Sequence, residues 1–236
     1  MAQQPPSLIK CSAYTQNVQR YSPLRPWYWV LFFACLALVV GLNLPFPQRP
    51  PQNPSALLQD SWFIWGFSYF GLLIMPVAAL MIEDARQRGL RWAPYVILYF
   101  FVGILPLSVY MARRPAHDQQ RLPTPAWLSQ RWFWALLALA VPVISVALLP
   151  RGSLEQLVET MRQNLGLTFM WLDIALNHVV ALPLAQADMQ RRHVQGQGAW
   201  LLAILLTGAL GLCLYMATRP AHSSPLFGKS YEEAAA

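Results

Sequence analysis

Charged residues are scarce in this sequence. They make up 11% of its 236 residues, whereas a typical soluble domain carries about 25%. Hydrophobic residues make up 56%, so the chain has few polar groups with which to cover a surface in water. The net charge of +7 does not indicate nucleic-acid binding, because the basic residues stand in short clusters between long apolar runs. That pattern is typical of a protein that crosses a membrane several times.

Cysteine is also rare, and the familiar catalytic motifs are missing. Cys11, Cys35 and Cys213 have no metal-ligand spacing, so we predict no metal site and identify no cofactor. The sequence contains no Gly-Lys phosphate-binding loop, no Gly-x-Ser-x-Gly elbow and no His-Glu-x-x-His zinc helix, which argues against an enzyme. The first 26 residues lack the apolar core of a cleaved signal peptide, and we predict a polar cytoplasmic arm there.

Long apolar runs are what the sequence has instead. A helix needs about 20 apolar residues to cross a hydrocarbon core of about 30 Å, and six stretches approach that length. The runs are continuously apolar rather than alternating, which favours helices over a β-barrel. The predicted fold is therefore an all-α, polytopic membrane protein with six transmembrane helices. The six stretches are Trp27–Leu44, Trp62–Ile82, Ala93–Ala112, Trp132–Leu149, Leu167–Gln186 and Ala199–Ala217.

One phrase occurs twice. YMARRPAH at residues 110–117 returns as YMATRPAH at residues 215–222, with one change and a step of 105 residues. We interpret this as a unit of three helices that is present in two copies. The further pairs related by a step of 105 or 104 are Trp27 and Trp132, Pro45 and Pro150, Gly103 and Gly208, Asp84 and Asp188, and Arg88 and Arg192. The predicted parts are a polar arm (1–26), repeat 1 (27–117), a linker (118–131), repeat 2 (132–222) and a flexible tail (223–236).

The segment IEDARQRGLRWAPYVILYFFVGILPLSVYMARRP carries a family resemblance. It resembles a widespread bacterial three-helix membrane domain of unknown function. That domain has an Asp at the start of one span, Asp-Ala-Arg-x-x-Gly about fifteen residues later, and then Tyr and Arg-Pro. Asp173 and Asp188 are 15 residues apart and fit this pattern, whereas Tyr69 takes the place of the upstream Asp in the first copy. The resemblance implies a three-helix fold and no particular activity.

An odd number of spans per repeat has a consequence for orientation. If all six spans cross, the second repeat is inverted relative to the first, as in inverted-repeat transporters. We favour this over a parallel arrangement in which Trp27–Leu44 or Trp132–Leu149 fails to cross. With the N-terminus inside, ten basic residues lie on the inner face and seven on the outer face. This difference slightly favours a cytoplasmic N-terminus, in a bacterial inner or internal membrane.

Few ionisable groups fall within the predicted spans. MWLDIALNHVVALP places Asp173, Asn177 and His178 near the middle of the fifth span, and Tyr69 lies at the matching place in the second. A carboxyl group in hydrocarbon costs a few kcal/mol or more when ionised, so it is expected to be protonated, paired or wet. One hypothesis is a proton- or ligand-handling site between the repeats. The other is an interhelical hydrogen bond from Asp173 to Tyr69, Ser68 or a backbone carbonyl.

Polar and small residues near the span ends form two further groups. The first comprises acidic and basic residues that begin two matching loops, and it predicts a helix cap in the headgroup region or a contact with lipid phosphate. The second comprises glycines that let helices approach closely. The loop residues are Asp84, Arg86, Arg88, Asp188, Arg191 and Arg192, and the glycines are Gly103, Gly208 and Gly211.

The connector GSLEQLVETMRQNLG differs from the other loops. Ser153 and Gln156 have the spacing of a capping box, and the apolar residues that follow repeat with a helical period. The pattern predicts a short amphipathic helix. It either lies on the membrane surface or packs on the bundle as a cap.

Three functional hypotheses follow. We favour a non-catalytic accessory or assembly component that binds lipid, pigment or a larger membrane complex, because so few polar groups lie within the spans. Its partners are the lipid bilayer, other membrane subunits or a hydrophobic small molecule, and not nucleic acid. The second hypothesis is a small inverted-repeat transporter or channel with Asp173 at the midplane. The third is an isoprenoid- or carotenoid-modifying enzyme, by architectural likeness to small lycopene cyclases whose Pro-x-Glu-Glu motif is missing here.

Overall fold

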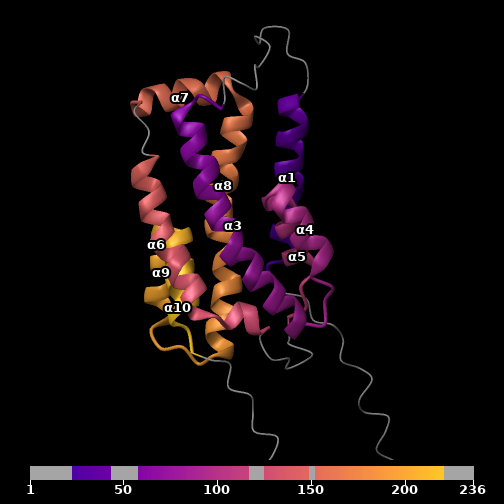
Figure 1. Cartoon of the computed structure of the whole chain (residues 1–236). Coiled ribbons are helices and arrows are strands. Elements are labelled where there is room, and N and C mark those ends of the chain that lie inside the picture. The colour runs from indigo at the N-terminus through magenta and orange to yellow at the C-terminus, as the bar shows by residue number, and fades with distance from the viewer. Residues whose placement is uncertain (1–22, 44–57, 117–124, 149–151, 221–236) are drawn as a thin grey trace, which may run out of the picture.

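The computed structural model describes residues 23–43, 58–116, 125–148 and 152–220. Every regular element in these ranges is helical, which confirms the predicted all-α class (Figure 1). The C-terminal tail and most of the predicted N-terminal arm lie outside these ranges. The elements are α1 (Arg25–Asn43), α3 (Ser61–Gln87), α4 (Ala93–Val102), α5 (Ile104–Arg113), a 3₁₀ turn (Ala126–Ser129), α6 (Arg131–Ala147), α7 (Leu154–Gln163), α8 (Leu165–Arg191), α9 (Gln197–Thr207) and α10 (Ala209–Thr218).

The expectation of six uninterrupted spans is wrong. Among the described residues, two helices are long and apolar enough to cross a membrane by length and composition, α3 and α8. The helices α1 and α6 are apolar but shorter. The predicted third and sixth spans are each interrupted by a glycine with a positive φ, +65° at Gly103 and +53° at Gly208. A side chain disfavours this backbone conformation, and glycine adopts it without that penalty.

At both glycines the chain turns back on itself. The rings of Tyr95 on α4 and Tyr110 on α5 lie 5.5 Å apart, although 15 residues of continuous helix would separate them by about 22 Å. The rings of Trp200 on α9 and Tyr215 on α10 lie 5.7 Å apart in the same way. The pairs α4–α5 and α9–α10 are therefore helical hairpins that leave and return at the same end of the bundle.

The two halves of the chain run in the same direction. The helices α3 and α8 lie side by side, with Trp65 stacked on Trp171 at 5.4 Å near their starts and Asp84 paired with Arg191 at their ends. In the first half α1 packs on α5, and in the second half α6 packs on α10. The expected inversion is therefore wrong, because each hairpin returns to the end of the bundle from which it starts and leaves α3 and α8 parallel.

Polar side chains begin the two long helices and α7, the short helix between α6 and α8. Asp60 accepts a hydrogen bond from the backbone amide of Phe63 at 2.8 Å and so caps α3. Asn164 does the same for the amide of Leu167 in α8. The predicted capping box of α7 is present, since Ser153 and Gln156 bond each other's backbone amides. These caps satisfy amides that a helix start leaves unpaired.

The outer faces of the helices carry large apolar side chains. Phe101 on α4 is 83% exposed, Val146 on α6 is 74% exposed and Leu206 on α9 is 72% exposed. The buried core lies instead between α3, α8 and the two hairpins. An exposed apolar surface of this kind is costly in water and favourable against lipid.

Candidate functional site

Asp173 lies at the tip of the α4–α5 hairpin. Its Oδ1 accepts a hydrogen bond of 2.7 Å from the backbone amide of Ile104, the first residue of α5. The side chain comes from α8, in the other half of the chain, and Asp173 is 4% exposed. A helix start carries partial positive charge and unpaired amides, so it stabilises a carboxylate. The N-cap residue of α5 is Gly103, which has no side chain, and Asp173 on the distant helix α8 supplies the capping carboxylate instead.

The remaining contacts of this tip complete a small network. Asn177 donates its side-chain amide to Asp173 Oδ1 at 3.0 Å and to the Asp173 carbonyl at 2.8 Å. The Tyr99 hydroxyl donates to Asn177 Oδ1 at 2.7 Å. A Cβ atom on Gly103 would collide with the Asp173 carboxylate. The partner of Asp173 is therefore a backbone amide, and not Tyr69, Ser68 or a carbonyl as the sequence suggested.

Tyr69 and His178 lie at the tip of the α9–α10 hairpin. The Tyr69 hydroxyl donates to the Thr207 carbonyl at 3.1 Å and accepts from the Ala209 amide at 3.2 Å. It also lies 3.1 Å from His178 Nε2. A Cβ atom on Gly208 would collide with both side chains. The structure thus divides the predicted polar cluster between two tips, and the long helix of each half holds the hairpin of the other.

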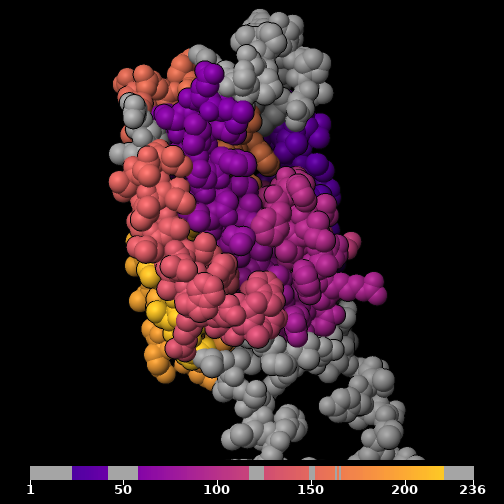
Figure 2. Space-filling model, viewed as in Figure 1, coloured from indigo at the N-terminus to yellow at the C-terminus, as the bar shows by residue number. Residues whose placement is uncertain are grey.

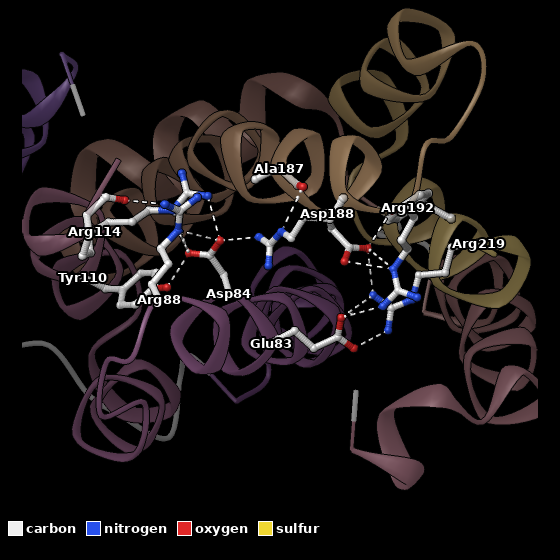
Figure 3. Close-up of polar contacts among 12 residues, drawn as sticks. Glu83, Asp84, Arg88, Tyr110, Arg114, Ala187, Asp188, Arg192 and Arg219 are labelled. Carbon is white, nitrogen blue, oxygen red and sulfur yellow. Dashed lines mark hydrogen bonds and ion pairs between the residues drawn. The ribbon is translucent and has the colours of Figure 1, made fainter. Parts of the chain in front are cut away.

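A second polar group lies at the end of the bundle where α3 and α8 finish (Figure 3). Asp84 accepts hydrogen bonds from Arg88 at 3.1 Å, from Arg114 at 2.7 and 2.8 Å, and from the Tyr110 hydroxyl. Arg88 also donates to the Pro115 carbonyl. This network joins the end of α3 to the end of the first hairpin.

The second half repeats these contacts with matching residues. Asp188 accepts from Arg192 at 3.0 Å, from Arg219 at 2.9 Å and from Tyr215 at 2.7 Å. Arg192 donates to the Pro220 carbonyl at 2.7 Å. The phrase that occurs twice in the sequence therefore supplies, in each half, the Tyr, Arg and Pro whose hydrogen bonds join the end of a hairpin to the end of a long helix.

Two residues without matching counterparts join the halves. Glu83 accepts hydrogen bonds from Arg192 at 2.9 Å and from Arg219, and Arg191 donates to Asp84. The position that corresponds to Glu83 in the second half is Ala187 (Figure 3), whose carbonyl accepts a hydrogen bond of 3.1 Å from Arg191. The ion pairs between the halves are thus asymmetric, because the acidic residues come from α3 and the arginines come from the second half.

The ionic network is buried. The carboxylate side chains are 1–5% exposed and their arginine partners 3–12% exposed. The predicted headgroup-facing loop residues Asp84, Arg88, Asp188, Arg191 and Arg192 therefore point inward, because each pairs with an opposite charge on its own helix or on a neighbouring one. Arg86 stays partly exposed.

Burial and the carboxylates act in opposite directions on the two arginines that follow the hairpins. Burial alone lowers the pKa of Arg219, but Asp188 and Glu83 raise it above its ordinary value. The pKa of Arg114 is raised in the same way by Asp84, against the effect of burial. Both guanidinium groups therefore stay charged, and each can hold a carboxylate by two parallel hydrogen bonds.

Sequence reasoning missed several of these residues. Glu83 has no acidic counterpart in the second copy to mark it, and no repeated pattern marks Tyr99. The signal for Tyr110 and Tyr215 was present in the repeated phrase. The predicted packing glycine Gly211 lies against the backbone of Ala203, where a Cβ atom would come within 2.8 Å of a carbonyl oxygen.

No protein-family model, curated protein or solved structure matches the chain. The resemblance to the three-helix membrane domain stays a prediction. In the ranges that the structure describes, no three His, Cys, Asp or Glu side chains gather in a group that could hold a metal ion.

Proposed function

We propose that this chain is an integral membrane protein built from two copies of one unit. In each unit two helices cross the bilayer, α1 and α3 or α6 and α8, and a hairpin enters from one side and returns. The length and hydropathy of α3 and α8 and the exposed apolar side chains support this placement. At 1.5 Å per residue, the 19 residues of α1 extend about 28 Å, close to the hydrocarbon thickness.

The distribution of arginine supports one orientation in a bacterial inner or internal membrane. Eleven arginines lie in the described ranges, and only Arg162 lies at the end that carries α7. The other ten lie where α3, α5, α8 and α10 finish and α1, α4 and α6 begin, an excess that the positive-inside rule assigns to the cytoplasm. These ten are Arg25, Arg86, Arg88, Arg91, Arg113, Arg114, Arg131, Arg191, Arg192 and Arg219.

Within that membrane the protein serves as a non-catalytic accessory or assembly component, which binds lipid or a larger complex through its outer apolar faces. The observation that carries this proposal is the use of the buried polar groups. Asp173 and Tyr69 cap hairpin tips, and Asp84 and Asp188 pair with arginines. The polar side chains thus hold the fold together instead of lining a reaction site.

A small transporter is the second candidate, and one observation favours it. Transporters often bind their substrate or coupling ion where interrupted helices meet near the midplane. Asp173 lies at such an interruption, beside the start of α5. On this hypothesis the Asp173 side chain alternates between two states. In one it binds a proton or a ligand, and in the other it accepts the hydrogen bond from the Ile104 amide.

Substitution of Asp173 separates the two candidates. In liposomes that contain the purified protein and a pH-sensitive dye, we expect no proton flux above that of empty liposomes. We also expect Asp173→Asn to retain much more thermal stability than Asp173→Ala, because an amide oxygen can still accept from Ile104. A proton flux in the wild type that Asp173→Asn abolishes would overturn the accessory role and support the transporter. Copurification from native membranes would then identify the bound lipids and proteins.

A further inference from the structure

The helix α7 differs from its neighbours in direction. It lies across the end of the bundle, above α6, whereas α3, α6 and α8 run along the bundle (Figure 1). It is joined to the start of α8 through the Asn164 cap. Its place is therefore the end opposite the arginine network.

The apolar side of α7 is only partly used by the protein. Leu157 and Met161 pack against the core. Leu154 is 70% exposed and Val158 is 48% exposed, and both line a shallow depression together with Glu155, Glu159 and Arg162. One strip of α7 thus faces the bundle, and a neighbouring apolar strip faces outward.

The helix α6, whose end lies near α7 (Figure 1), also exposes apolar side chains. On α6, Leu139 is 62% exposed, Val143 is 57% exposed and Val146 is 74% exposed. Figure 2 shows α6 along one side of the molecule, with α7 at its upper end. α7 therefore lies at the end of α6 (Figure 1 and Figure 2), at the level where the hydrocarbon core would end and the headgroups begin.

We infer that α7 is an interfacial helix, whose Leu154 and Val158 enter the boundary between the acyl chains and the headgroups. This inference rests on the proposed membrane placement. The polar strip of α7 carries Glu155, Glu159 and Arg162 and so has a net charge of −1. A strip of this charge does not attract anionic lipid, so the contact depends on apolar insertion and suits a neutral, zwitterionic surface.

Spin labels at defined positions test the inference on the full chain in nanodiscs of zwitterionic lipid. In a background with the native cysteines replaced by alanine, each label reports its accessibility to oxygen, which concentrates in lipid, and to a water-soluble nickel chelate. We expect the ratio of oxygen to nickel accessibility to be severalfold higher at the two apolar positions than at the two acidic ones. The labelled substitutions are Leu154→Cys and Val158→Cys, Glu155→Cys and Glu159→Cys, and Val143→Cys on α6 as the lipid-facing control.

The control separates two failures. If position 143 is accessible to oxygen and positions 154 and 158 are as accessible to nickel as positions 155 and 159, α7 lies in water and the inference is wrong. If position 143 is also in water, the proposed membrane placement fails, and the inference fails with it. If the ratio at 154 and 158 rises only when anionic lipid is added, the apolar insertion described above is refuted.

Discussion

The substitution Gly103→Ala tests the hairpin directly. Residue 103 has φ +65° and ψ −126°, a conformation that costs about 1–3 kcal/mol for a residue with a side chain. The new Cβ atom would also meet the Asp173 carboxylate. Displacement of that carboxylate from the Ile104 amide removes a charge-assisted hydrogen bond worth about 1.5–3 kcal/mol.

The two effects together predict a loss of about 3–6 kcal/mol, which is large against a total stability of about 5–15 kcal/mol. For a chain of this size, at about 2–4 °C per kcal/mol, the midpoint of thermal unfolding should fall by about 6–24 °C. In a Cys11→Ala background the two remaining thiols, Cys35 and Cys213, are buried at 3% and 0% exposure, so a thiol-reactive dye in mild detergent reports unfolding.

Gly71→Ala is the matched control, since a Cβ atom at this helical glycine would meet nothing within 4 Å. It should leave the midpoint unchanged or raise it slightly, because alanine suits a helix better than glycine. The double change Gly103→Ala with Asp173→Ala should cost less than the sum of the single changes, because Asp173 is the group that the new atom strikes. If Gly103→Ala and Gly71→Ala have the same midpoint, the α4–α5 hairpin does not depend on the positive φ of Gly103 or on its close contact with Asp173, and the reasoning is refuted.

Two further predictions concern the other end of the bundle. Asp84→Asn should lower the free energy of unfolding by about 3–5 kcal/mol, because it leaves buried arginines without their charge partner. Arg86→Gln, at a partly exposed position, should change it by about 0.5 kcal/mol or less. Equal effects of the two substitutions would show that the ionic network contributes little to stability. Single cysteines at Gly89 and Gly196 should both be protected from an impermeant maleimide in intact cells, while a cysteine at Glu155 should be labelled. Labelling of one of the two glycine positions and not the other would restore the inverted arrangement.

Some features of the site can be predicted from the residue pattern alone. The repeated phrase points to equivalent positions, and the structure places Arg114 and Arg219 at equivalent ends of the two hairpins. The spacing of Ser153 and Gln156 is sufficient to predict the cap of α7, because a capping box is a local contact. The burial of Asp84 cannot be predicted in this way. A charged residue at the end of an apolar run can face headgroups or a partner, and only the neighbouring helices decide which.

The sequence by itself determined that this chain is helical, apolar along most of its length and patterned in two similar halves, because composition and periodicity are local properties. Only the tertiary structure decided that the chain turns back at Gly103 and Gly208 and that the halves are parallel. A run of apolar residues is compatible with one straight helix or with two short antiparallel ones. The choice depends on a positive φ at one residue and on a carboxylate that reaches the Ile104 amide from a helix 69 residues further along the chain.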